Sequence, residues 1–164
     1  MFGTVISLMN GSPVINNLAL LMRYIFLMVS LATLVSAAFA HEGATGIVKD
    51  RMGKFKESQL ILKLMIKSAK VDDFEKIADM SSALHQWGSE MTDYFPAGSD
   101  GNPSEAAPAI WSDPEGFKAA TTRFSKAALT ITVAADAGDK ASMMKAIKAT
   151  AASCKACHSV YRLK

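Results

Sequence analysis

The sequence predicts an all-α fold, an antiparallel four-helix bundle, and three observations support this. Four segments repeat apolar residues at spacings of three and four, the pattern of amphipathic helices. No window of the chain shows a credible strand pair or an internal repeat. Two of the three connections between the segments are short, which favours antiparallel neighbours, and a Cys-x-x-Cys-His motif near the C-terminus indicates a cofactor in the core of the bundle.

The first two helices are predicted from their apolar faces. The first is expected over residues 45–69, with lysines mostly on its other side. Its expected apolar face consists of Val48, Met52, Phe55, Gln59, Leu62, Met65, Ile66 and Ala69. Asp72 or Asp73 is expected to cap the second helix, which runs to about Phe95. Prolines, glycines and an asparagine then predict a loop over residues 96–110.

The last two helices are predicted from their start and stop signals. Ser112 and Glu115 match a capping box, and the proline between them suits a first helical turn. This third helix is expected to stop at Gly138. Asp139 is expected to cap the fourth helix, which runs to about Arg162.

Both cysteines of the chain, Cys154 and Cys157, lie in the last expected helix and are followed by His158. C-x-x-C-H is the attachment signature of c-type haem, in which the thiols form thioethers and the histidine binds iron. A helix places these three residues on one face. A thioredoxin-type pair would normally open the helix of a βαβ unit, and zinc needs about four ligands, whereas only His41 and His85 remain. The sequence therefore predicts one haem c, covalently attached to the C-terminal helix.

The N-terminal region has the features of an export signal. Residues 22–40 combine a positive start, an apolar core and an A-x-A site, with cleavage expected after Ala40. An uncleaved anchor is the alternative, but the apolar stretch is shorter than the ~20 residues that a span needs. Because a complete signal begins at Met22, residues 1–21 are interpreted as an extension from an upstream start codon. The domain should then occupy residues 41–164, in the periplasm, with no stable membrane insertion after cleavage.

The charge balance bears on macromolecular partners. The chain has 18 Lys+Arg against 15 Asp+Glu, a formal net charge of +3. Because the sequence shows no basic stripe, nucleic acid is not an expected partner.

Three segments carry a family resemblance. Near its C-terminus the chain contains Ala-Ser-Cys-Lys-Ala-Cys-His-Ser-Val-Tyr-Arg (residues 152–162), which resembles the end of the cytochromes c′, the class II c-type cytochromes. Residues 108–113 are similar to the entry to their third helix, and residues 134–139 to their turn into the fourth. The resemblance spans the expected mature chain. It implies a periplasmic four-helix bundle, often a homodimer, with the haem between the helices.

The resemblance also implies roles for single residues. Arg51 matches an arginine near the haem propionates, and Met52, the next residue, would also lie against the haem. Glu105 matches a loop position that contacts the haem edge, and Arg162 would sit beside the axial histidine. Ordinary solvated roles for the two arginines and for Glu105 remain the alternatives.

Phe55 decides the expected chemistry, because the resemblance places it over the open coordination position of iron. Phenylalanine has no lone pair to offer iron, and its ring would block bulky ligands. We therefore expect one-electron transfer at iron and binding of small gases such as nitric oxide and carbon monoxide. The alternative is a low-spin electron carrier with Met52, one turn away, as a ligand. A peroxidase would need a distal acid–base group, which Phe55 does not supply, so the protein is not expected to be an enzyme and its redox partner is left open.

Overall fold

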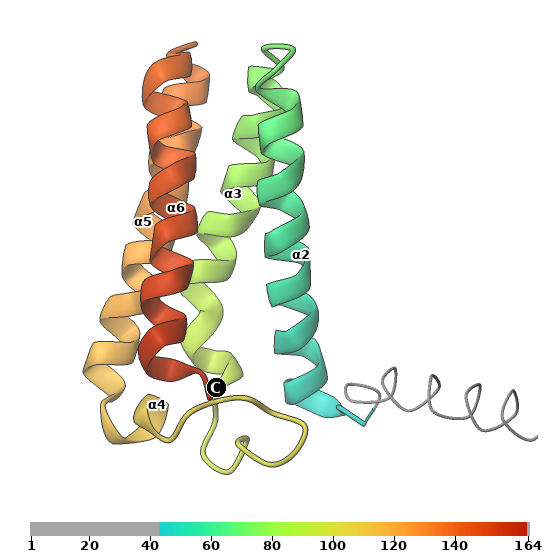
Figure 1. The fold of residues 1–164 in the computed structure, drawn as a ribbon, viewed down its shortest axis with the longest axis vertical. Helices are drawn as coiled ribbons and strands as arrows, with labels where there is room; N and C mark the ends of the chain where they lie inside the picture. The colour runs from blue at the N-terminus through green and yellow to red at the C-terminus, as the bar shows by residue number, and fades with distance from the viewer. Residues whose placement is uncertain (1–42, 164) are drawn as a thin grey trace, which may run out of the picture. The chain divides into compact units, whose positions relative to one another are not determined.

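The computed structural model describes residues 43–163, and in this part of the chain four long antiparallel helices form a bundle (Figure 1). The elements are α2 (Gly46–Ser68), α3 (Phe74–Glu90), the 3₁₀ helix η1 (Met91–Tyr94), the short α4 (Ala109–Ser112), α5 (Pro114–Asp136) and α6 (Lys140–Tyr161). The predicted all-α bundle is confirmed. The predicted export signal and upstream extension lie outside the described residues. None of the described helices is long and apolar enough to cross a membrane.

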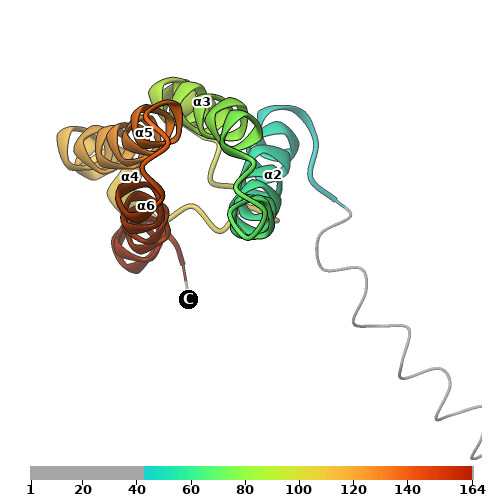
Figure 2. The same ribbon diagram turned by 90° about the horizontal axis from the view of Figure 1, so that it is seen from above.

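The four long helices do not pack equally tightly. α5 lies against both α3 and α6, and α2 lies along α3 (Figure 2). Gly88 permits the close approach of α3 to α5, because a Cβ atom there would lie 2.9 Å from the Cα atom of Ser125. At one end of the bundle, an ion pair of 2.5 Å between Lys140 and Asp72 joins the α5–α6 turn to the α2–α3 turn.

Two of the three predicted caps are as expected. The Asp73 carboxylate accepts a hydrogen bond from Lys76 N at 3.3 Å and begins α3. The Asp139 carboxylate accepts one from Ser142 N at 3.0 Å and begins α6. Gly138 precedes it with a positive φ of 65°, a conformation that glycine adopts without strain.

The predicted capping box of the third helix is wrong by one residue. Asp113 is the N-cap of α5, and its carboxylate accepts a hydrogen bond from Gly116 N at 3.0 Å. Ser112 cannot serve there because it ends the short helix α4, which begins inside the expected loop and buries Ile110. Proline does occupy the first turn of α5, as predicted.

The main core contains Met65, Ile77, Leu84, Ile131 and Met143, all fully buried. They come from all four long helices, so burial of their side chains holds the bundle together.

The expected inner face of the first helix needs correction. Gln59 is exposed and Ile66 is 46% exposed, whereas Arg51, Ser58 and Ser68 are buried. The spacing of apolar residues predicts the wrong side of this helix as the one facing the core, because the true inner face includes polar residues. Their polar groups are satisfied locally, as where Ser58 Oγ donates to a backbone carbonyl one turn earlier at 2.8 Å.

Candidate haem site

The inner face of α6 carries the three motif residues, Cys154, Cys157 and His158, and all three are half-buried. Both thiols are free, and each packs against one of the two apolar clusters of the bundle. Burial raises the pKa of both thiols. Burial, followed by the nearby Arg162, lowers the pKa of the His158 imidazole. Both effects favour the neutral imidazole, the form whose free ring nitrogen can bind a metal.

Phe55 of α2 faces His158 across the bundle. The two ring centroids are 6.3 Å apart and the ring planes meet at 74°. Phe55 also contacts Trp87 edge-on at 5.4 Å, and the other edge-on aromatic pairs of the described residues lie at 5.0 to 5.2 Å. The Phe55–His158 pair is therefore the longest of these edge-on contacts, and it joins a ring that can ligate to one that cannot.

Arg51, one turn before Phe55, is only 3% exposed. Its guanidinium donates to Tyr94 O at 3.1 Å, to Ser99 Oγ at 2.7 Å and to Ser104 Oγ at 2.6 Å, and also to Ser99 O. Burial lowers the pKa of Arg51, and the charge of Asp100 opposes this. All four hydrogen-bond acceptors are neutral, so the cation is buried without a directly bound anion, which is costly unless one is supplied.

An aromatic group closes the same end of the bundle. The Arg51 guanidinium lies over the Phe95 ring, 4.4 Å from its centroid. Phe95 contacts Phe117 at 5.0 Å, and Phe117 contacts Tyr161 at 5.2 Å. Trp111 Nε1 donates to Phe95 O at 3.0 Å. The sequence did not single out Phe95 or Tyr161 as site residues, because their contacts join segments far apart in the chain.

Glu105 and Arg162 meet at the end of α6. Arg162 Nε donates to Glu105 Oε2 at 2.6 Å, and both side chains are about half exposed. Backbone bonds support the pair, since Leu163 N donates to Glu105 O at 2.8 Å and Ala107 N to Tyr161 O at 3.1 Å. The loop before α4 is thus fastened to the residues that follow the haem motif.

Met52 is half-buried on α2. Phe55, and not Met52, packs against the main core and faces His158.

Trp87 supplies a further polar group that the sequence did not assign. Its side chain is buried beside Phe55, and its Nε1 atom has no hydrogen-bond partner among the described residues. A buried donor without an acceptor is rare and calls for an explanation.

These features fit a haem. Two free thiols and an imidazole with a lowered pKa share one face, as covalent attachment and iron ligation require. The ring opposite the imidazole is that of Phe55, which cannot ligate iron. A buried guanidinium and an unpaired indole N–H are suited to the carboxylates that haem carries.

Comparison with known proteins gives the same result. The family model described as "Cytochrome C'" matches residues 46–162. A cytochrome c′ of Rubrivivax gelatinosus is 38% identical over 74 residues, which are 45% of this chain and 57% of that protein. Cytochrome c-556 of Agrobacterium tumefaciens (strain B2A) is 33% identical over 122 residues, 73% of this chain and 98% of that protein. The chain thus spans little more than half the length of the first curated relatives that it matches.

A solved structure agrees in fold. The nitric oxide complex of a variant of cytochrome c prime from Alcaligenes xylosoxidans has a TM-score of 0.64 and 30% identity, covering 72% of this chain and 94% of that one. With the family model matching most of the described domain, the chain belongs to the cytochrome c′ family, and its Cys154–Cys157 pair implies a covalently bound haem c.

Proposed function

We propose that this protein is a periplasmic cytochrome of the c′ type that exchanges one electron at its haem iron and binds small diatomic gases, such as nitric oxide and carbon monoxide. The observation that carries the proposal is Phe55 opposite His158, with the two rings 6.3 Å apart. When bound, the haem supplies the redox-active iron and the coordination position for a gas. Cys154 and Cys157 would hold the haem in thioether bonds, and His158 would bind its iron.

Phe55 controls access to the iron. Its ring cannot ligate, and it is wedged between Trp87 and Phe95 at centroid distances of 5.4 and 6.4 Å. A ligand must displace this packed ring to bind, so small diatomic molecules are favoured over larger ones. Solved relatives support the gas specificity, since two structures of cytochrome c prime from Alcaligenes xylosoxidans contain nitric oxide.

The remaining side chains position the haem. Arg51 binds its carboxylates, because this buried cation has only neutral hydrogen-bond partners. Met52 lies against the haem as a non-ligand, while Glu105 and Arg162 close the edge beside His158. The family is non-enzymatic.

Location and assembly complete the proposal. The family is typically periplasmic. We infer that the signal over residues 22–40 is cleaved after Ala40 and that residues 1–21 are an upstream extension. The family resemblance implies a domain that is often a homodimer, and the oligomeric state of this protein is left open.

Optical spectra of the purified protein test the function. The ferric form should be high-spin, and the ferrous form should bind carbon monoxide. Phe55→Met places a thioether opposite His158 and should produce a low-spin spectrum, whereas the control Leu60→Met, at a 55% exposed position of the same helix, should not. A low-spin spectrum of the unaltered protein that Met52→Leu converts to high-spin would overturn the proposal in favour of methionine ligation.

A further inference from the structure

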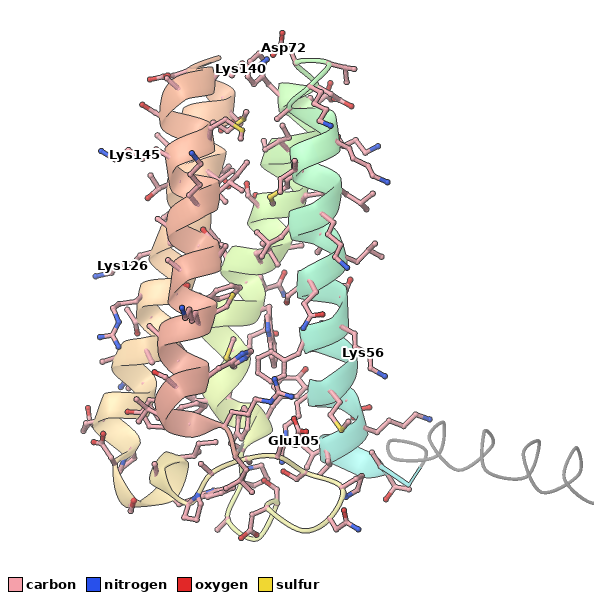
Figure 3. All side chains as sticks on the ribbon, in the orientation of Figure 1. Lys56, Asp72, Glu105, Lys126, Lys140 and Lys145 are labelled. Carbon is pink, nitrogen blue, oxygen red and sulfur yellow. The ribbon has the colours of Figure 1, made fainter. Side chains whose placement is uncertain are left out.

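The exposed surface of α5 and α6 is mostly basic, although the sequence shows no basic stripe, because its cations are spread over two helices. The acidic residues of α5 and α6 and of the turn between them are Glu115, in the first turn of α5, and Asp136 and Asp139, at the α5–α6 turn. We call the following exposed residues the basic face: Lys118, Arg123 and Lys126 of α5, with Lys145, Lys148 and Lys155 of α6. Figure 3 shows Lys126 and Lys145 pointing outward on the same side of the bundle, although they come from different helices.

The lysines of α2 are in different surroundings. Lys49 is followed by Asp50, and Lys56 by Glu57, on the same helix. The adjoining α3 adds Glu75 and other acidic residues. Charges of both signs are therefore mixed along α2 and α3, whereas the carboxylates of α5 and α6 lie only at the helix ends and the basic face between them is positive. A one-signed surface concentrates and orients a partner of opposite charge far better than a mixed one.

The basic face belongs to the haem helix itself. Lys155 lies between Cys154 and Cys157 in the sequence but on the exposed side of α6. Because a helix with its side chains is about 10–12 Å across, a partner on this face comes within about one helix diameter of the haem-bearing cysteines.

We propose that the basic face is the docking surface for a redox protein with an acidic surface; this rests on the proposed function and names its partner. In the reduction, the partner gives up one electron and is oxidised by one electron, and ferric iron becomes ferrous. No bond or proton needs to move. A haem-bearing helix argues for a redox partner over nucleic acid or lipid, neither of which would accept or donate this electron.

Stopped-flow reduction of the holoprotein tests the proposal, with reduced flavodoxin as an acidic one-electron donor. The charge-reversal variant Lys126→Glu/Lys145→Glu/Lys148→Glu should slow the second-order reaction at least tenfold at low ionic strength, since electrostatic steering changes association rates by about 10 to 10³. At 0.5 M salt, where the Debye length is only a few ångströms, the difference should almost vanish.

A matched control changes the same net charge elsewhere. Lys49→Glu/Lys63→Glu/Lys67→Glu alters three exposed positions of α2 and should slow the reaction less than threefold. Equal slowing by both triple variants would show that only net charge matters and would overturn the proposal. Salt-sensitive binding of the unaltered protein to phosphatidylglycerol vesicles or to duplex DNA, lost in the basic-face variant without a change in the flavodoxin rate, would also overturn it.

Failure of docking and failure of the proposed function give different results. If the function holds, all variants keep a high-spin ferric spectrum and bind carbon monoxide after reduction by dithionite. Normal spectra with an unchanged flavodoxin rate would contradict the docking surface alone.

Discussion

Replacing Arg51 by methionine should loosen the loop that closes the haem end of the bundle. The guanidinium holds Tyr94 O, Ser99 O and the hydroxyls of Ser99 and Ser104, and it lies over the Phe95 ring. Methionine keeps a long apolar side chain but supplies no donor. The hydroxyls of Ser99 and Ser104 can then form hydrogen bonds with other groups or with water. The carbonyl groups of Tyr94 and Ser99, which are partly or fully buried, lose their hydrogen-bond donor.

The size of the effect follows from these lost bonds. Each buried polar group left unpaired costs about 1–3 kcal/mol. Two carbonyl groups would therefore cost about 2–6 kcal/mol, and nothing is subtracted for burying a cation, because in the holoprotein Arg51 is proposed to be paired with the haem carboxylates. For a domain of this length, that corresponds to a fall in Tm of about 8–24 °C.

Thermal unfolding of the holoprotein, followed by circular dichroism at 222 nm, measures this loss. Arg123→Met, at an exposed position of α5, is the control and should change Tm by less than about 2 °C, as is usual for surface substitutions. Hydrogen exchange should show faster exchange at Ser99 and Ser104 in the Arg51 variant alone, since Ser99 N and Ser104 N make hydrogen bonds within the same loop. A change in Tm as small as that of the control, or unchanged exchange in the loop, would refute the role of Arg51 as its anchor.

Two more predictions concern single polar groups. Trp87→Phe should destabilise the holoprotein by about 1 kcal/mol beyond the effect of the smaller ring, because it removes a buried N–H donor. Trp111→Phe should have an effect of the same size, because it removes the hydrogen bond to Phe95 O. Chemical denaturation measures the loss in the free energy of unfolding for both variants. The Trp87 N–H has no hydrogen-bond partner among the described residues. If Trp87→Phe is neutral or stabilising, this N–H has no acceptor in the holoprotein either. Hydrogen bonds with Ser142 lower the pKa of Asp139 below its usual 3.8. The ionised carboxylate therefore stabilises the folded state fully at pH values above 3.8, and this stability is lost as the pH falls through the lowered pKa of the folded state. Asp139→Asn should therefore make the urea midpoint fall less steeply between pH 5 and pH 3, and parallel curves for the two proteins would contradict this.

Local signals in the sequence predicted the helices well. Asp73 and Asp139 each precede an amphipathic segment, and each caps a helix. The start of α5 was harder because Ser112 and Asp113 are adjacent and both suit an N-cap. The choice depends on α4, whose short turn ends at Ser112 and leaves Asp113 to cap the next helix. Neighbouring structure, and not intrinsic preference, decided the boundary.

The candidate site was predictable only in part. Helical spacing brings Cys154, Cys157 and His158 to one face of a single helix, so their juxtaposition is a local property. The hydrogen bonds of Arg51 reach Ser99 and Ser104, 48 and 53 residues away, and the Glu105–Arg162 pair spans 57 residues. No periodicity within a segment encodes such distances.

Those long-range bonds also explain how the two sides of the site are kept apart. α2 carries Phe55 and α6 carries His158, yet these helices are not among the closely packed pairs of the described bundle. Their separation is set indirectly, through α3 and through the loop, which Arg51 fastens to α2 and which the Glu105 pair fastens to the end of α6. Because the loop is bonded at both ends, a shift at either end should be passed to the other and should change the spacing between the phenyl and imidazole rings. On this reasoning the loop determines the width of the haem site, while the core of α3, α5 and α6 determines its position.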